Sequence, residues 1–243
     1  MQRMVSPEPD RIPHQKKGSP EPTETRHCPV CHSMIERTLD DPKNRRLYLV
    51  CGNCGFIFVD SRDRLSPRLE KARYLEHNND LSEEGYRLFL DSFLQGAIIP
   101  YVEKGARVLD FGSGPAPVFS WILKRNGYRV DSFDPFFCPD YSWTKRRYNA
   151  IVLVEVLEHL SGPVETLNSL IERLHPGGYL CMRSSLHDGD LSRFKAWWYR
   201  QDPTHISFFT PGTIEYLSTG LGLEIISISE NRDIILQRRV TDS

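Results

Sequence analysis

The chain has 243 residues and a formal net charge of −1, with 39% hydrophobic and 26% charged residues. This length provides one hydrophobic core of ordinary size and a small additional module, and the near-neutral charge excludes a uniformly basic nucleic-acid-binding protein. The sequence shows no signal peptide and no apolar run long enough to cross a membrane. We therefore expect a cytoplasmic location and no membrane partner.

The N-terminal part contains a proline-rich arm and two cysteine pairs. Five prolines and few apolar residues predict disorder over 1–26. The pairs Cys28-x-x-Cys31 and Cys51-x-x-Cys54 are separated by the segment 32–50, a spacing typical of a structural zinc site in which four thiolates close the coordination shell. We predict a zinc ribbon over 27–60. The alternatives are two disulfides, which a cytoplasmic location disfavours, or four unrelated thiols.

The segment from Lys43 to Arg73 is basic, with eight Lys or Arg residues against three Asp or Glu residues. A basic ribbon is able to position a nucleic-acid backbone, so nucleic acid is one partner to consider. The alternative is a solvated linker face, because runs of charge are common on protein surfaces.

Residues 61–96 are predicted to form a helical linker or cap. Ser82 stands at a capping position, and one apolar face suited to core packing follows at helical spacing: Tyr86, Phe89, Leu90, Phe93 and Leu94. The run His77-Asn78-Asn79 before it has two interpretations. It lines the mouth of a ligand site, or its asparagine side chains form a local turn network.

The stretch ARVLDFGSGPAP at 106–117 is the most informative in the chain. It predicts a buried strand that ends at Asp110, a tight turn through Gly112 and Gly114, and an amphipathic helix that ends near Gly127. Glycine lets the backbone approach a ligand closely, and free N–H groups at the start of the helix face that ligand. The pattern therefore indicates a binding loop.

The rest of the chain alternates strands with helices. A strand over Arg129–Phe133 leads to Asp134, and an acidic residue about 20 positions after a glycine loop is typical of binding to ribose hydroxyls. The later elements are predicted as strand, helix, strand, helix and two strands: Ala150–Val154, Pro163–Leu174, Tyr179–Arg183, Pro211–Ser218, Glu224–Ser229 and Ile234–Gln237. This order predicts an α/β fold with a doubly wound, mostly parallel sheet and a ligand at the carboxyl ends of its strands.

Four motifs, VLDFGSGPAP, FDP, VLVEVLEHL and LHPGGYL, resemble those of class I S-adenosylmethionine-dependent methyltransferases, with a Rossmann-like domain over 97–239. More narrowly, the cysteine module with KARYLEHNND, DPFFCPD and WWYRQDPTHISFF resembles a group of bacterial methyltransferase-like proteins without an assigned substrate. The resemblance implies an enzyme that uses S-adenosylmethionine and methylates an unidentified acceptor.

The resemblance also implies cofactor-binding residues. They form the loop under the methionine part, the ribose position, the strand end beside the cofactor and the cofactor mouth: Asp110, Phe111, Gly112, Gly114, Asp134, Pro135, Glu155, Val156 and His77. Two departures from the family pattern stand out. Ala116 replaces the third glycine of the loop, and only the segment 135–149 separates Asp134 from the strand at Ala150, which is too short for a helix and a strand. A substitute adenine wall is expected from Phe136, Phe137, Tyr141 or Trp143.

An insertion over 186–210 is expected to lie at the substrate side of the sheet. It is rich in aromatic residues, which favours an acceptor pocket: Trp197, Trp198, Tyr199, Phe208 and Phe209. The alternative is a lid whose aromatic rings serve only for packing. His205 and His159 are the candidate catalytic bases, because imidazole titrates near neutral pH.

We predict a methyltransferase whose acceptor is either a small molecule, favoured by the aromatic insertion, or an RNA or protein positioned by the zinc ribbon. The alternative is a non-catalytic adaptor that retains the fold and binds a partner through the ribbon.

Overall fold

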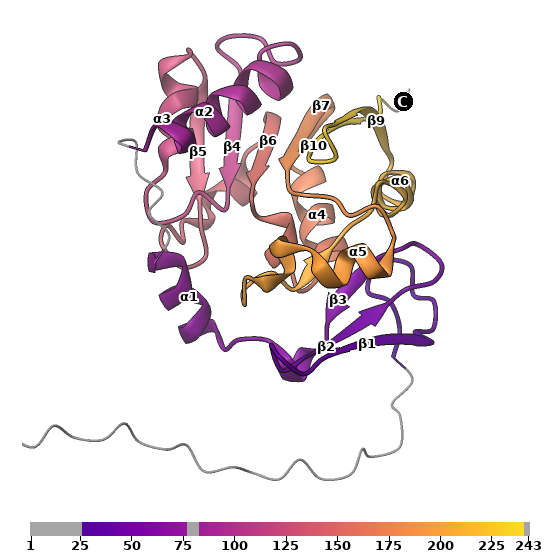
Figure 1. The fold of residues 1–243 in the computed structure, drawn as a ribbon. Helices are drawn as coiled ribbons and strands as arrows, with labels where there is room; N and C mark the ends of the chain where they lie inside the picture. Colours follow the sequence, from indigo (N-terminus) through magenta and orange to yellow (C-terminus); the bar gives the residue numbers. More distant parts are fainter. Residues whose placement is uncertain (1–25, 77–82, 241–243) are drawn as a thin grey trace, which may run out of the picture.

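The computed structural model describes residues 26–76 and 83–240. The predicted cap Ser82 and the run His77-Asn78-Asn79 lie outside these residues. The chain forms two sheets, a six-stranded one in the upper part of Figure 1 and a four-stranded one in the lower part. Among the described residues, no helix combines the length and apolarity needed to cross a membrane.

The six-stranded sheet has the order β5-β4-β6-β7-β10-β9. Strands β5, β4, β6 and β7 are parallel, and β10 is antiparallel to both of its neighbours. Their bounds are β4 Arg107–Phe111, β5 Arg129–Phe133, β6 Tyr148–Val154, β7 Leu174–Arg183, β9 Leu223–Ser229 and β10 Asp233–Arg238. The predicted doubly wound, mostly parallel sheet is confirmed.

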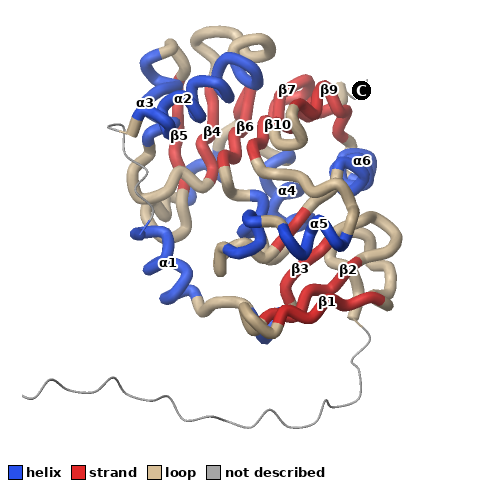
Figure 2. The backbone as a smooth tube through the Cα atoms, viewed as in Figure 1, coloured by secondary structure: helices blue, strands red, loops and turns tan. Residues whose placement is uncertain are grey.

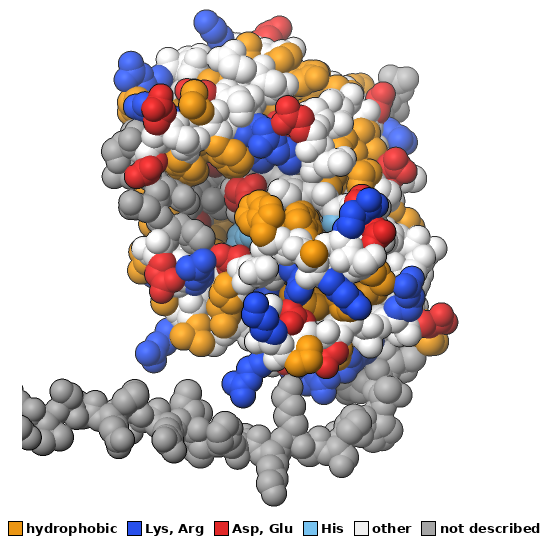
Figure 3. All heavy atoms as spheres, viewed as in Figure 1, with side chains coloured by type: hydrophobic (Ala, Val, Ile, Leu, Met, Phe, Trp, Pro, Cys, Tyr) orange, Lys and Arg blue, Asp and Glu red, His pale blue; other side chains and the backbone are white. Residues whose placement is uncertain are grey.

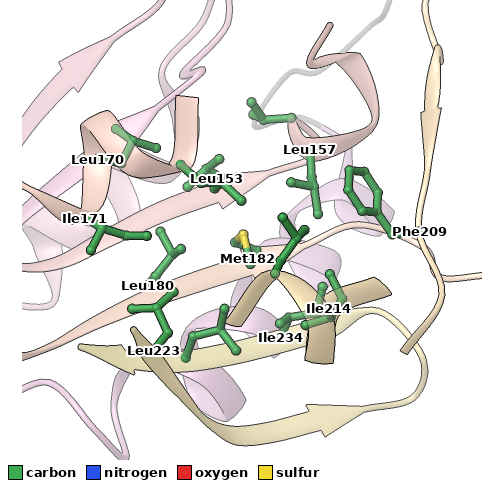
Figure 4. Packing of buried hydrophobic residues seen from close by; sticks show 14 of the residues in the cluster. Leu153, Leu157, Leu170, Ile171, Leu180, Met182, Phe209, Ile214, Leu223 and Ile234 are labelled. Carbon is green, nitrogen blue, oxygen red and sulfur yellow. The ribbon is translucent and has the colours of Figure 1, made fainter. Parts of the chain in front are cut away.

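Helices cover both faces of this sheet because its central strands alternate their side chains. Ala150 and Val152 of β6 pack toward α2 (Glu84–Phe93) and α3 (Val118–Arg125). Ile151 and Leu153 pack toward α4 (Pro163–Ile171) and α6 (Pro211–Gly220) on the opposite face. Figure 4 shows side chains from β6, β7, α4 and α6 in this second layer. A central strand buried on both faces needs this continuous apolar sequence.

The helix predicted to reach Leu174 instead ends at Ile171, and β7 begins at Leu174. The HPGG turn is thus part of the strand. Gly178 allows this, because a Cβ there would lie 2.9 Å from the His175 carbonyl oxygen and 3.0 Å from that of Asn149. No larger residue fits so close to two backbone carbonyls.

The short segment after β5 holds only the 3-10 helix η3 (Tyr141–Lys145) before β6 begins. This agrees with the prediction that the segment 135–149 has no room for both a helix and a strand. Among the described residues, β5 is therefore one of the two edge strands of the sheet, with β9 at the other edge.

The four-stranded sheet joins the cysteine-rich segment to the insertion. Its order is β1-β2-β3-β8, with β1 at Arg37–Asp41, β2 at Arg46–Val50, β3 at Ile57–Val59 and β8 at Ser207–Phe208. β3 and β8 pair antiparallel, with Ile57 opposite Phe208. The insertion also contains α5 (Leu191–Ala196) and η5 (Trp198–Gln201).

The aromatic side chains of the insertion mostly pack on this sheet. Phe194, Tyr199 and Phe208 are at most 2% exposed and share a cluster with Tyr48 and Ile57. The packing alternative for these rings is therefore the correct one, since burial against the ribbon strands accounts for their apolar character.

The remaining helices are η1 (Ser61–Asp63), α1 (Pro67–Glu76), the π-helical turn η2 (Leu94–Ile98) and η4 (Leu157–His159). Figures 1 and 2 place α1 at the carboxyl ends of β5 and β4. Contacts hold it there: Lys71 donates to the Phe136 carbonyl at 3.0 Å, and the rings of Tyr74 and Phe136 are 5.9 Å apart.

A buried ion pair ties α2 to the sheet. The guanidinium of Arg183, on β7, binds both carboxylate oxygens of Asp233 on β10 at 2.6 Å. It also donates to the Phe89 carbonyl and lies 4.5 Å from the centre of the Phe89 ring. Arg183 is 1% exposed, so its charge depends on these partners.

Asp233→Ala should therefore lower the free energy of unfolding by about 3–5 kcal/mol, because it leaves a buried guanidinium without its counter-charge. Urea unfolding followed by circular dichroism measures the change. The control is Asp188→Ala, which removes an exposed pair with Arg193 and should alter stability by less than about 0.5 kcal/mol. Equal effects of the two substitutions would contradict the prediction.

Candidate functional site

A cavity of about 610 Å³ lies where the carboxyl ends of β4, β5 and β6 meet α1, α2 and the turn before β8. The surface is hollowed between the two halves of the molecule in Figure 3. Of the eleven residues predicted for cofactor binding or catalysis, nine line this cavity: Phe111, Gly112, Gly114, Asp134, Pro135, Glu155, Val156, His159 and His205. Its volume is in the usual range of ligand pockets.

The loop after β4 is shaped to admit a ligand. Gly112 has φ +79°, and a Cβ on it would collide with the Val156 side chain. Gly114 has φ +70°, but the space beside it is open. The hydroxyl of Ser113 lies between them, is buried and lacks a hydrogen-bond partner among the described residues. A buried hydroxyl of this kind on a cavity wall fits a polar ligand group, and the sequence analysis overlooked it.

Asp134 organises the cavity through its carboxylate. It accepts hydrogen bonds from the backbone N–H of Gly114 at 2.9 Å, Phe136 at 2.8 Å and Phe137 at 3.0 Å. These bonds join the glycine loop to the segment after β5. A carboxylate accepts about four hydrogen bonds, so one lone pair remains for a ligand hydroxyl.

Asp110 is not part of the cavity lining. It is buried and accepts a 2.6 Å hydrogen bond from Ser120 on α3, which places it behind the glycine loop. Burial raises the pKa of Asp110 to about 6 despite the Ser120 hydrogen bonds. His77, which the resemblance places at the cofactor mouth, lies outside the described residues.

Glu155 follows β6 in a left-handed conformation, with φ +53°. Such a conformation is unfavourable for a residue with a side chain and is typical of functional sites. Its carboxyl is 3.2 Å from the Tyr199 hydroxyl. Burial, together with the nearby charge of Glu158, raises the pKa of Glu155 to about 9.

Glu158 was not predicted as a site residue, although it stands in the EHL motif. Its side chain on η4 is fully buried and accepts hydrogen bonds from the Tyr199 hydroxyl at 2.5 Å and the Ser184 hydroxyl at 2.8 Å. The insertion, through Tyr199, therefore contacts both acidic residues at the end of β6.

His159 and His205 come from different halves of the molecule and meet at the cavity. Their ring centres are 4.8 Å apart. His159 Nδ1 is 3.0 Å from the Thr204 carbonyl oxygen, and His205 Nδ1 is 2.7 Å from that of Tyr199. Burial lowers the pKa of His205, so its ring is neutral at physiological pH.

The cavity walls differ in part from the predicted ones. Phe136 and Phe137 line it as expected. Trp143 is buried against Phe111 and Phe133, and Tyr141 is exposed, so neither is part of the lining.

Helices α1 and α2 contribute residues that the sequence analysis assigned to packing or did not consider: Tyr74, Tyr86 and Phe89. Tyr74 packs edge-on against His159, with ring centres 5.2 Å apart. The predicted aromatic acceptor pocket is wrong in its residues, since Trp198 is 70% exposed and the other four aromatic residues of that set are absent from the lining.

The four cysteines of the two pairs also converge. Their sulfur atoms all lie within 4.8 Å of one another, with Cys28 and Cys54 3.7 Å apart and Cys31 and Cys51 3.4 Å apart. The N–H of Val30 points at Cys28 Sγ at 3.4 Å. Tetrahedral zinc with Zn–S bonds of about 2.3 Å places its sulfurs about 3.8 Å apart, so the geometry suits the metal.

Comparison with protein families gives one match. A family described as a methyltransferase domain matches residues 59–228, which is more than half of the chain. The chain belongs to this family. No curated protein matches the chain.

Solved structures show the same fold at low sequence identity. An O-methyltransferase family protein from Burkholderia thailandensis is 13% identical with a TM-score of 0.51, over 72% of this chain and 64% of that protein. The chain therefore spans less than two thirds of that protein's length. The PH0226 protein from Pyrococcus horikoshii OT3 is 15% identical with a TM-score of 0.50, over 70% of this chain and 99% of its own.

The raised pKa of Asp110 has a consequence for stability. Because its pKa is about 6 in the folded chain and ordinarily 3.8, the folded state binds the proton more tightly than the unfolded state. Its contribution to stability is complete below pH 3.8 and is lost as the pH rises through about 6. The difference of about 2 pH units corresponds to about 3 kcal/mol.

The comparison of wild type with Asp110→Asn isolates this effect. We expect the free energy of unfolding of the variant, relative to that of wild type, to rise by about 3 kcal/mol between about pH 3.5 and pH 7. Any effect of the amide that does not depend on pH cancels in this change. Chemical unfolding at a series of pH values measures it. A pH-independent difference would show that Asp110 titrates normally.

Proposed function

We propose that this methyltransferase acts on a small molecule whose nucleophilic atom lies beside His159 and His205. The observation that supports this is one shared cavity: the glycine loop and both imidazoles open into the same space. Methyl transfer is an in-line displacement that depends on alignment of donor and acceptor, and a single enclosed site provides it.

The residues that would hold S-adenosylmethionine are those of the glycine loop and the end of β5. The unpartnered Ser113 hydroxyl and the close approach that Gly112 allows suit the methionine end. The remaining lone pair of Asp134 suits a ribose hydroxyl, and Phe136 and Phe137 suit the adenine. The cofactor supplies a methyl group on a positively charged sulfur.

The methyl acceptor then occupies the part of the cavity near η4 and the turn before β8. If the acceptor is protonated, its proton must leave before or during attack. The Nε2 atoms of His159 and His205 are the groups that contact it in this proposal, since their Nδ1 atoms are bonded to backbone carbonyls.

A small molecule is favoured over RNA because five of the eight basic residues between Lys43 and Arg73 form hydrogen bonds within the chain. Arg46 is buried and bonds to backbone carbonyls. The others with partners are Arg62 with Asp60, Arg64 with the Val59 carbonyl, Lys71 with the Phe136 carbonyl and Arg73 with Asp202. Acidic side chains are interspersed with basic ones on the face seen in Figure 3, unlike the continuous basic stripe of a nucleic-acid site.

The four cysteines are proposed to bind one structural zinc ion. None of the four forms a disulfide, which agrees with the cytoplasmic location that we propose. The site lies against α6, where the Thr213 hydroxyl donates to the Cys54 carbonyl at 2.8 Å. The metal would therefore stabilise the sheet that positions His205.

The function is tested with His205→Ala. Turnover should fall by roughly 10²–10⁴, as when a residue that assists proton removal is lost. The affinity for S-adenosylmethionine should stay within about twofold, because the glycine loop is unchanged. Calorimetry gives the affinity, and transfer of labelled methyl groups to the metabolite fraction of a cell extract gives the turnover.

The control is His175→Ala, an exposed histidine at the other end of β7, which should behave as wild type. Label in the RNA or protein fraction would contradict the small-molecule acceptor. Absence of cofactor binding by wild type would favour the non-catalytic adaptor.

Cys51→Ser should remove the zinc, since three thiolates and a hydroxyl bind the metal far more weakly than four thiolates. Elemental analysis should show one equivalent less of zinc than in wild type. Turnover should fall with it, whereas cofactor binding persists, because Gly112 and Asp134 lie at the strand ends of the six-stranded sheet. Cys181→Ser, in a buried strand position outside the cluster, is the control, and unchanged zinc in Cys51→Ser would refute the assignment.

A further inference from the structure

Three metal-ligating side chains converge beside the cavity, away from the cysteine cluster. Glu158 and His159 come from η4, and His205 comes from the turn before β8. Their ligand atoms all lie within 4.8 Å of one another. Glu158 and His205 are buried and His159 is partly exposed, while both histidines line the cavity.

The hydrogen bonds of the two imidazoles determine which nitrogen is free. A backbone carbonyl only accepts hydrogen bonds, so the Nδ1 atoms of His159 and His205 must carry the protons that they donate to Thr204 and Tyr199. With Nδ1 engaged in this way, Nε2 is the nitrogen of each ring that is available to bind a metal. Metal-binding histidines in proteins are usually oriented in this way, through their other ring nitrogen.

Glu158 is oriented by a similar second layer of contacts. The Tyr199 hydroxyl donates to one carboxylate oxygen and the Ser184 hydroxyl to the other. Oε1 of Glu158 is 3.9 Å from His159 Nε2. Among the described residues, no lysine or arginine forms an ion pair with this carboxylate, and a buried carboxylate without a cationic partner is costly. A bound cation would supply the missing charge.

We propose that Glu158, His159 and His205 bind a divalent cation. Two imidazole nitrogens and one carboxylate oxygen form a donor set that suits Zn²⁺, Fe²⁺ or Mn²⁺. Three protein ligands leave coordination positions open, as in catalytic metal sites. The open positions face the cavity, because both histidines line it.

The role of the cation in catalysis rests on the proposed function, whereas its binding does not. An acceptor hydroxyl bound to the cation loses its proton to water at a much lower pH than a free hydroxyl does. Its oxygen then forms a bond to the methyl carbon while the carbon–sulfur bond breaks and leaves the neutral thioether. The metal thus takes over the proton-removing role assigned to His205, because one Nε2 lone pair cannot bind both a metal and a proton.

Mn²⁺ is the appropriate probe, because it prefers oxygen and nitrogen ligands over the thiolates of the cysteine cluster. The full chain with its zinc in place is titrated with Mn²⁺, and the electron paramagnetic resonance signal of free Mn²⁺ is measured. We expect one Mn²⁺ per chain in wild type, displaced by added Zn²⁺. Glu158→Gln and His159→Ala should each weaken binding by at least about tenfold, while His175→Ala leaves it unchanged.

Two further measurements distinguish loss of the metal ligands from loss of the fold. Binding of S-adenosylhomocysteine to each variant shows that its cofactor site is folded. In wild type, bound Mn²⁺ should broaden the ring resonances of His159 and His205 more than those of His175, without any substitution. No saturable Mn²⁺ or Zn²⁺ binding beyond the cysteine site overturns the metal proposal. If S-adenosylhomocysteine still binds in that case, the methyltransferase assignment stands and His205 retains its role as a base.

Discussion

The buried guanidinium of Arg46, on β2, holds the turn of the insertion against the four-stranded sheet. It donates to the backbone carbonyls of Asp202 at 3.1 Å and His205 at 3.3 Å, and also to those of Arg200 and Pro203. The one planar guanidinium thus donates hydrogen bonds to four carbonyl oxygens of the same turn. Because that turn ends at His205, a residue of the cysteine-rich sheet sets the position of an imidazole in the cavity of the methyltransferase sheet.

The chemistry of the cavity depends on the position of the insertion beside the end of β6. Tyr199, held against the ribbon strands, extends its hydroxyl to Glu155 and Glu158 at the end of β6. Two contacts hold the unfavourable backbone conformation of Glu155: its backbone N–H donates to the Arg183 carbonyl at 2.8 Å, and its carboxyl is 3.2 Å from the Tyr199 hydroxyl. The cysteine cluster therefore contributes to the cavity indirectly, because it stabilises the sheet whose strand β3 pairs with β8 of the insertion.

Several site residues could be predicted from the sequence because their signals are local. Gly112 and Gly114 are predicted because a tight turn beside a ligand needs residues that adopt a positive φ. Asp134 is predicted because it follows the glycine loop at the spacing typical of a ribose-binding carboxylate. The Cys28 and Cys51 pairs follow from zinc-ligand spacing. The missing helix and strand after β5 follow from the length of the segment. In each case the information lies within a short stretch of the chain.

The sequence by itself determined the alternating α/β order, the ligand-binding edge of the sheet and the grouping of the cysteines. Only the tertiary structure decided where the insertion lies. β8 pairs with β3 although most of the chain separates them, and no local pattern encodes which edge strand a short segment joins. The same pairing buries Tyr199 and Phe208 against the ribbon and brings His205 to His159 and Glu158. Side chains so far apart in sequence form one site only when tertiary contacts bring their segments together.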